Sequence, residues 1–200
     1  VSVTSMLAAF SVVGLAASLA VQDSLANLAS GIMLLISKPF KIGDYVEIDD
    51  VSGTVSIISL IHTKLKTVDN KIIYVPNSKV IDTKIINYTE QEKRLVDLNI
   101  DVSYDAPIEE VRRSLLASVE AVGLFTDEPD PPFAAIQKFD ESSISYVLRA
   151  WVKTADYWSA RYRLLEQIKT DFDARGIEMT YLHMNIHISE AATLQGGTKK

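Results

Sequence analysis

Few residues in this chain have the type and spacing that metal binding or catalysis requires. His183 and His187 form an H-x-x-x-H pattern, which on a helix would suggest a metal-binding pair. Here Leu182, Met184 and Ile186 alternate with polar residues and predict a strand instead. Residues four apart in a strand lie about 13 Å from each other at about 3.3 Å per residue, too far for one ion. Both histidines are therefore interpreted as structural.

Other catalytic patterns are missing from the sequence. It contains no cysteine, no glycine-rich phosphate loop and no G-x-S-x-G nucleophile motif. The acid pairs Glu109-Glu110 and Asp140-Glu141 are sequence neighbours on expected solvated elements, and are interpreted as surface charges. Trp151 and Trp158 are interpreted as core or interface anchors. We therefore expect a protein that is not an enzyme and that holds no cofactor and no metal.

The N-terminal segment is almost free of charge, since Asp23 is the only charged residue between Val1 and Ser37. A helix of 22 residues is about 33 Å long at about 1.5 Å per residue. This length matches the bilayer core of about 30 Å, so Val1–Gln22 is predicted to be a transmembrane helix. Small residues let helices approach closely in a membrane, which favours packing against copies of the same helix. The predicted packing residues are Gly14, Ala16, Ala17, Ser18 and Ala20.

Two alternatives for this segment are a signal peptide and a buried helix of a soluble protein. The segment lacks the positively charged start of a signal peptide, and its uncharged region exceeds the usual length of about 7–15 residues. The chain does not begin with Met, so we expect residues before Val1, including further membrane spans, to be missing from this sequence.

One face of the predicted transmembrane helix combines small, polar and leucine residues. Spacings of three and four place these residues in one stripe: Thr4, Ala8, Ser11, Leu15, Leu19 and Gln22. Around a shared axis this stripe would line a passage narrowed by rings of Leu15 and Leu19. Hydrophobic constrictions of this kind can block ions by dewetting. The alternative is that both leucines make ordinary lipid or helix contacts.

A second helical pattern follows Asp23. Apolar residues recur with the period of an amphipathic helix at Leu25, Leu28, Ala29, Ile32, Leu35 and Ile36. Asp is a good N-cap, so a bend is predicted at Gln22-Asp23, followed by a helix that lies along the membrane interface. Residues 1–38 would thus hold a kinked pore-lining helix and an interfacial helix. Pro39 would end the second helix.

The rest of the chain predicts two further domains, which makes the fold class membrane α plus α+β. Residues 39–90 contain five short strand patterns with tight turns, including Asp69-Asn70, and predict a small Sm-like or SH3-like β domain. Residues 91–190 give the order strand, helix, strand, strand, helix, strand, which is the ferredoxin-like arrangement. Residues 191–200 show no pattern and are expected to be disordered.

The net charge of −6 is unevenly distributed. Residues 1–37 contribute −1 from one acid, residues 38–90 contribute 0 from seven bases and seven acids, and residues 91–200 contribute −5 from 13 bases and 18 acids. The acidic C-terminal part argues against nucleic-acid binding, and the neutral β domain lacks the aromatic platform of an RNA-binding barrel. Lys38 and Lys41 follow the apolar segment, which predicts that residues 39–200 are cytoplasmic.

Five segments follow one another along the chain: Gly14–Gly31, Pro39–Val46, Gly53-Thr54-Val55, Lys71–Ser78 and Ile85–Tyr88. In this order they resemble motifs of the small-conductance mechanosensitive (MscS-type) channel family. Gly14–Gly31 resembles the family's pore helix, and Pro39–Val46 resembles its junction into the β domain. Gly53-Thr54-Val55 resembles the first hairpin of that domain. Lys71–Ser78 resembles the K-x-I-x-x-P-N signature and precedes a similar segment, Ile85–Tyr88. The resemblance extends to about residue 189.

This resemblance implies a homoheptamer in a bacterial inner (plasma) membrane, multi-pass in the full-length protein, above a hollow cytoplasmic chamber. Membrane tension would open it to release ions and small osmolytes on hypo-osmotic shock, with membrane lipids as partners and no cofactor. Leu15 and Leu19 match the family's two constriction leucines. A membrane-tethered ligand-binding or signalling module is the alternative, and would need a pocket in the C-terminal domain.

The sequence departs from the family pattern at several positions. Gln22 matches a family glutamine before the bend, but Asp23 stands where the best-known member has glycine. Ser11 and Ser18 replace packing glycines, while Gly14 is retained. Asp23 is expected to cap the second helix or to form a ring of carboxylates that favours cations at the cytoplasmic mouth, and these two roles do not exclude each other.

Overall fold

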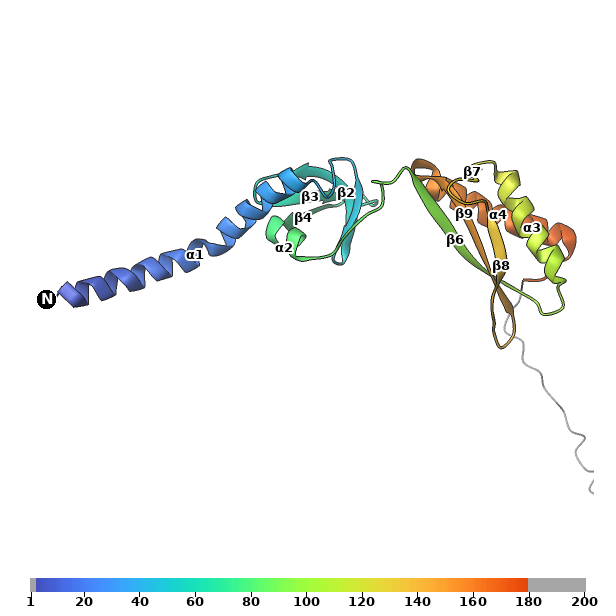
Figure 1. The fold of residues 1–200 in the computed structure, drawn as a ribbon, viewed down its shortest axis with the longest axis horizontal. Helices are drawn as coiled ribbons and strands as arrows, with labels where there is room; N and C mark the ends of the chain where they lie inside the picture. The colour runs from blue at the N-terminus through green and yellow to red at the C-terminus, as the bar shows by residue number, and fades with distance from the viewer. Residues whose placement is uncertain (1–2, 180–200) are drawn as a thin grey trace, which may run out of the picture. The chain divides into compact units, whose positions relative to one another are not determined.

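A computed structural model describes residues 3–179 of the chain, which divide into two compact units. The first unit ends at Lys93 and the second begins at Arg94. Figure 1 traces the elements of each unit in chain order. The predicted last strand with His183 and His187, and the predicted disordered tail 191–200, lie outside the described residues.

The first unit begins with one long helix, α1 (Val3–Ser37), of which Met6–Ser37 is long and apolar enough to cross a membrane. Helical structure runs through Gln22 and Asp23 without a break. The prediction that Asp23 caps a separate second helix is therefore wrong. Most residues around it are good helix formers, and an unbroken helix keeps every backbone N–H and C=O bonded where water is scarce. A bend of the continuous helix at Gln22-Asp23 stays a prediction.

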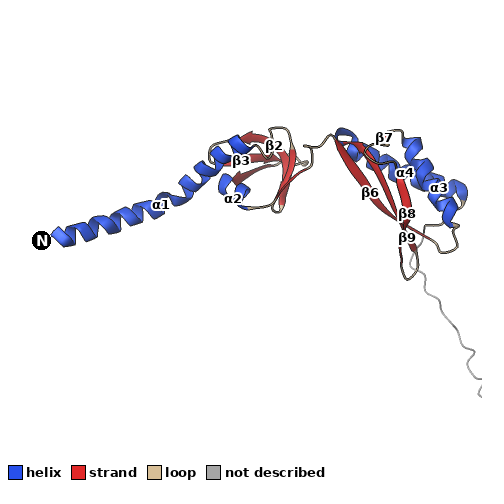
Figure 2. Ribbon diagram, in the orientation of Figure 1, coloured by secondary structure: helices blue, strands red, loops and turns tan. Residues whose placement is uncertain are grey.

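The β domain of the first unit is a five-stranded antiparallel sheet, as the turn and alternation signals predict. Its strands are β1 (Tyr45–Ile48), β2 (Val51–Ile58), β3 (His62–Lys66), β4 (Ile72–Pro76) and β5 (Ile85–Asn87). They lie in the order β4-β3-β2-β1-β5, and a short helix, α2 (Asn77–Asp82), connects β4 to β5 (Figure 2). The sequence gives no signal for α2, because six residues are too few to display helical periodicity.

Alternation along these strands builds a small core that also includes the end of α1. Leu34 of α1 and Phe40 of the following loop are buried with strand residues such as Val46 and Ile48. The remaining members of this core are Val55, Leu65, Val75 and Val80. Burying each of these side chains contributes on the order of 1.5–3 kcal/mol. The C-terminal end of α1 is thus part of the hydrophobic core of the β domain.

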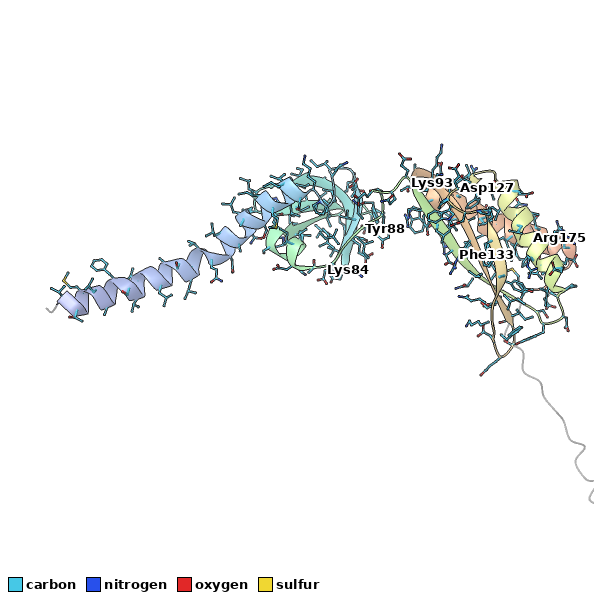
Figure 3. All side chains as sticks on the ribbon, viewed as in Figure 1. Lys84, Tyr88, Lys93, Asp127, Phe133 and Arg175 are labelled. Carbon is cyan, nitrogen blue, oxygen red and sulfur yellow. The ribbon has the colours of Figure 1, made fainter. Side chains whose placement is uncertain are left out.

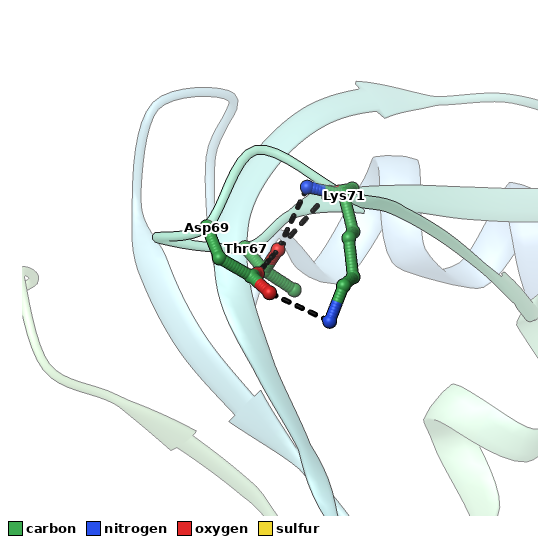
Figure 4. A network of polar contacts seen from close by, with 3 residues as sticks. All are labelled: Thr67, Asp69 and Lys71. Atoms are coloured by element: carbon green, nitrogen blue, oxygen red, sulfur yellow. Dashed lines mark hydrogen bonds and ion pairs between the residues drawn. The ribbon is translucent and has the colours of Figure 1, made fainter.

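The turn between β3 and β4 is held by a local polar network (Figure 4). The Thr67 hydroxyl bonds to the Asp69 carboxylate, and the Lys71 N–H donates to Thr67 Oγ1 at 2.9 Å. Lys71 Nζ lies 2.6 Å from Asp69 Oδ2. These contacts, from Lys71 first and from Thr67 second, lower the pKa of the Asp69 carboxyl. Asn70 adopts the left-handed conformation (φ 69°) that tight turns require.

The second unit places two helices on a four-stranded sheet. Its elements are β6 (Lys93–Val102), α3 (Ile108–Val122), β7 (Phe125–Thr126), β8 (Phe133–Phe139), β9 (Ile144–Lys153), η1 (Thr154–Asp156) and α4 (Tyr157–Arg175). The central strand β9 pairs with β6 on one side and with β7 and β8 on the other. The sequence does not predict β7, because two residues cannot show an alternating pattern.

The core of this unit lies between the sheet and the helices. Helix residues such as Val111, Leu115, Leu164 and Phe172 are buried against the even-numbered residues of β6 and β9. Leu165, the neighbour of Leu164, is 39% exposed. It follows Leu164 by one position, and a step of about 100° turns it out of the face that contacts the sheet.

Candidate pore helix and its docking site on the β domain

The predicted pore stripe lies on the part of α1 that no other described element covers. Residues from Met6 to Ala26 are exposed in the single chain, and Leu15 and Leu19 are 63% and 62% exposed. Figure 3 shows the side chains of this part of α1 projecting from the helix. An unbroken helix keeps the stripe Thr4, Ala8, Ser11, Leu15, Leu19 and Gln22 on one face. Its role as a pore lining stays a prediction.

Within the described part of this chain, no contact requires the predicted packing residues to be small. A Cβ added to Gly14 would meet nothing within 4 Å. The neighbouring small side chains Ala16, Ala17, Ser18 and Ala20 are likewise exposed. The helix therefore exposes many apolar side chains, both large and small. Exposed apolar surface of this extent is typical of a helix that contacts a membrane or further copies of the chain.

The second half of α1 docks onto the β domain through a polar contact. Asn27 Oδ1 accepts hydrogen bonds from the backbone N–H and the hydroxyl of Ser78, both at 3.0 Å. Its amide nitrogen donates to the backbone carbonyl of Asp23 at 2.8 Å. One side chain thereby joins the helix to α2 and fixes its own orientation against the preceding turn.

Gly31 brings the helix backbone directly against the β domain one turn further on. A Cβ at this position would lie 2.1 Å from the Leu60 carbonyl oxygen and 2.6 Å from Asn77 Nδ2, closer than atoms can approach. Only glycine fits here. Leu34, which follows by almost one turn, is 2% exposed and enters the core. Asn27, Gly31 and Leu34 thus form the docking face of α1.

The docking partner is held together by Asn77, which is buried and forms hydrogen bonds through its side-chain nitrogen, its side-chain oxygen and its backbone N–H. Its Nδ2 donates to the Ser59 carbonyl and its Oδ1 accepts from the Thr63 hydroxyl, both at 2.9 Å. Its backbone N–H donates to the Ile61 carbonyl at 3.1 Å. Asn77 and Thr63 are completely buried. These contacts explain the P-N pair of the motif: Pro76 ends β4, and Asn77 ties the start of α2 to the β2–β3 turn.

A second polar cluster anchors the segment that follows α1. The Asp44 carboxylate accepts hydrogen bonds from the Lys41 backbone N–H at 2.9 Å and from the Asn87 side-chain amide at 2.8 Å. Partial desolvation acts to raise the pKa of the Asp44 carboxyl, but these hydrogen bonds and the Lys41 charge outweigh it and lower the pKa. Gly43 has a φ of 101°, which allows the chain to turn between Lys41 and Asp44. The cluster explains the K-I-G-D part of the junction motif.

Asp23 and the apolar side of the second half of α1 remain uncovered. No hydrogen bond or ion pair to the Asp23 carboxylate occurs among residues 3–179, and this residue is exposed. Leu25, Ile32, Leu35 and Ile36 of the predicted amphipathic stripe are also exposed. The face that touches the β domain is therefore the one with Asn27, Gly31 and Leu34, and these exposed residues of the predicted apolar stripe point elsewhere.

Sequence reasoning did not identify the docking residues. Gly31 interrupts a helical run, and Asn27 is a polar residue within an apolar segment. A glycine and an amide one turn apart on one helix face could have been recognised as a close-contact site.

The two halves of the described chain match two protein-family models. The model described as "Mechanosensitive ion channel, beta-domain" matches residues 23–90, and the model described as "Mechanosensitive ion channel MscS, C-terminal" matches residues 96–179. The chain is 38% identical over 178 residues to a small-conductance mechanosensitive channel of Edwardsiella ictaluri, covering 89% of this chain and 62% of that protein.

Other similarities agree with these matches. A small-conductance mechanosensitive channel of Helicobacter pylori is 32% identical over 189 residues, covering 94% of this chain and 69% of that protein. The crystal structure of Helicobacter pylori MscS in the closed state superposes with a TM-score of 0.89 at 31% identity, covering 96% of this chain and 76% of that one. The chain thus spans about two thirds of the length of these curated relatives.

Replacing Gly31 by Ala should loosen α1 from the β domain, because the added methyl overlaps the Leu60 carbonyl and the Asn77 amide. We expect a cost of about 1–3 kcal/mol, measured as faster hydrogen exchange of the α2 amides. Gly14→Ala is the matched control: it meets open space and improves helix propensity, so exchange in α2 should not change. Equal protection of α2 in both variants would contradict the docking role of Gly31.

The Asp44 cluster should stabilise the junction in a pH-dependent way. Because the folded-state pKa lies below the ordinary value of 3.8, the ionised carboxylate contributes stability that is present above 3.8 and is lost as the pH falls through the folded pKa. We expect Asp44→Asn to weaken hydrogen-exchange protection of β1 by about 1 kcal/mol at pH 7, and the difference from wild type to vanish below the folded pKa. The exposed Asp82→Asn is the control. A difference independent of pH would reject this role.

Proposed function

Since this chain belongs to the MscS family of mechanosensitive ion channels, we propose that it forms a tension-gated channel whose pore is lined by α1. The whole protein would assemble as a homo-oligomer, a heptamer by resemblance, in a bacterial inner membrane with further spans before this segment. Residues 39–200 would be cytoplasmic. The observation that carries this proposal is the long α1 with its exposed apolar and small residues, anchored only at its C-terminal half.

The fold details fit this proposal. We infer that the five-stranded β domain is Sm-like or SH3-like, supported by the strand order β4-β3-β2-β1-β5 around a small core. We also infer a ferredoxin-like second unit, supported by the order of β6, α3, β8, β9 and α4. The last strand of that arrangement would be the predicted one beyond residue 179.

The proposed gate is a pair of leucine rings. With copies of α1 arranged around an axis, Leu15 and Leu19 would face the lumen one helical turn apart and exclude water from it. Membrane tension favours the state that occupies more area in the bilayer, so outward tilting of the helices would widen the rings and wet them. Ions and small osmolytes would then leave the cell on hypo-osmotic shock, with no chemical step.

The docking face gives this motion a fixed end. Asn27, Gly31 and Leu34 hold the second half of α1 on the β domain, and the exposed stripe with Leu25 and Ile36 would face the membrane interface. Tilting would therefore occur in the uncovered part of α1, which carries both leucines.

Replacing Leu19 by Ser should open the gate at lower tension or make it leak, because a ring of hydroxyls stabilises water in the constriction. Patch recordings of the whole channel should show a reduced threshold, and cells that express it should grow slowly. Leu15→Ser should act in the same direction. An unchanged threshold in both variants would reject the leucine gate.

Gly14→Leu should disturb assembly or opening, because a large side chain keeps neighbouring pore helices apart. The β domain should still fold, since a Cβ added to Gly14 meets no other part of the described chain within 4 Å. Particle size in detergent and single-channel currents provide the measurement, with Gly14→Ala as the tolerated control. Normal rings with normal currents would place Gly14 towards lipid.

Asp23 is proposed to form a ring of carboxylates at the cytoplasmic mouth, supported by its exposure and by the absence of a partner for its carboxylate among residues 3–179. Wild type should prefer cations modestly. Asp23→Asn keeps the side-chain shape, and it should shift the reversal potential in a salt gradient towards anions. An unchanged reversal potential would remove Asp23 from ion selection.

A further inference from the structure

The sheet of the second unit has one face that its helices do not cover. The even-numbered residues of β6 and β9 point into the core with α3 and α4. Side chains on the other face include Leu95 of β6, and Arg149 and Trp151 of β9. Phe133, the first residue of β8, pairs directly with Arg149 across the strands, so both side chains share this face.

A hollow of about 400 Å³ lies on this open face. It lies beside the gap between β7, which ends at Thr126, and β8, which begins at Phe133, both paired with the same edge of β9. The loop between these two strands lines one side of the hollow. Its lining is Leu95, Asp130, Pro131, Phe133, Arg149 and Trp151. Figure 3 labels Phe133 on the sheet and Asp127 in the same loop. The volume lies in the range of about 300–1,000 Å³ typical of small-molecule sites.

The lining is apolar apart from two opposite charges. Arg149 donates from Nε to Asp97 Oδ2 at 2.9 Å, which orients the guanidinium, and its side chain is 47% exposed. An arginine has four further N–H groups on its terminal nitrogens, which suit a carboxylate. Asp130 makes no hydrogen bond or ion pair with another residue of the described range, and its carboxylate can accept from an ammonium group.

We propose that this hollow binds a zwitterionic α-amino acid with an apolar side chain. The carboxylate of the ligand would pair with Arg149 and its ammonium group with Asp130, while its side chain would cover Trp151 and Phe133. Charge complementarity selects this class: a hydrocarbon would leave both charges unused, and a simple anion would face the carboxylate of Asp130. The inference is independent of the pore, because every residue that it uses lies in the second unit.

L-Leucine is the probe, and Trp151 is the reporter. The chain has two tryptophans, and Trp158 does not line the hollow, so Trp158→Phe leaves Trp151 as the only one. In this background we expect a saturable change of tryptophan emission with leucine in the intact protein. 4-Methylpentanoate lacks the ammonium group, isoamylamine lacks the carboxylate and glycine lacks the apolar side chain, so each should bind at least about tenfold more weakly.

Variants of the two charged residues test the assignment directly. Arg149→Gln and Asp130→Asn should each weaken leucine binding at least about tenfold, with unchanged circular dichroism. Asp127→Asn removes a charge from the same loop outside the hollow and should leave binding unchanged. The proposal is overturned if leucine gives no saturable change, if either single-charge analogue binds equally well, or if iodide cannot quench Trp151 because another copy covers the hollow.

Discussion

The close approach of α1 to the β domain at Gly31 is the constraint on which the rest of the first unit depends. With no side chain at this position, the helix backbone lies against the Leu60 carbonyl and the buried Asn77 amide. Asn27 and Leu34 then meet Ser78 and the core one turn on either side. One half of α1 is thus packed on the β domain and the other half is uncovered, an arrangement that fits the proposed gated pore.

Much of the fold follows from local pattern. Alternation in β6 and β9 and the turn at Asp69-Asn70 predict the strands and the hairpin correctly, because one buried face leaves a period of two in the sequence. The elements that were missed, α2 and β7, are too short to show any period. The error at Asp23 has another origin: cap preference is a local tendency, and the continuous backbone bonding of a long helix outweighs it.

The candidate functional site could also be predicted only in part from the sequence. The stripe with Leu15 and Leu19 can be recognised from spacing alone, but the role proposed for it requires copies of the chain, and in the single chain the stripe is exposed. The docking face could not be derived from pattern. Gly31 and Asn27 act through contacts with residues about 30 to 50 positions away in sequence, and neither hydropathy nor periodicity encodes those contacts. The hollow around Trp151 likewise arises only where three strands and a loop meet.

The central claim is that one face of α1 lines the conducting pathway. The chain contains no cysteine, so single cysteines can be introduced along α1 and treated with a charged thiol reagent during current recording. The account predicts that modification at positions 8, 11, 15 and 19 changes the current of open channels, whereas modification at Phe10 and Val13 on the opposite face does not. Equal effects on both faces, or effects confined to the second set, would contradict it.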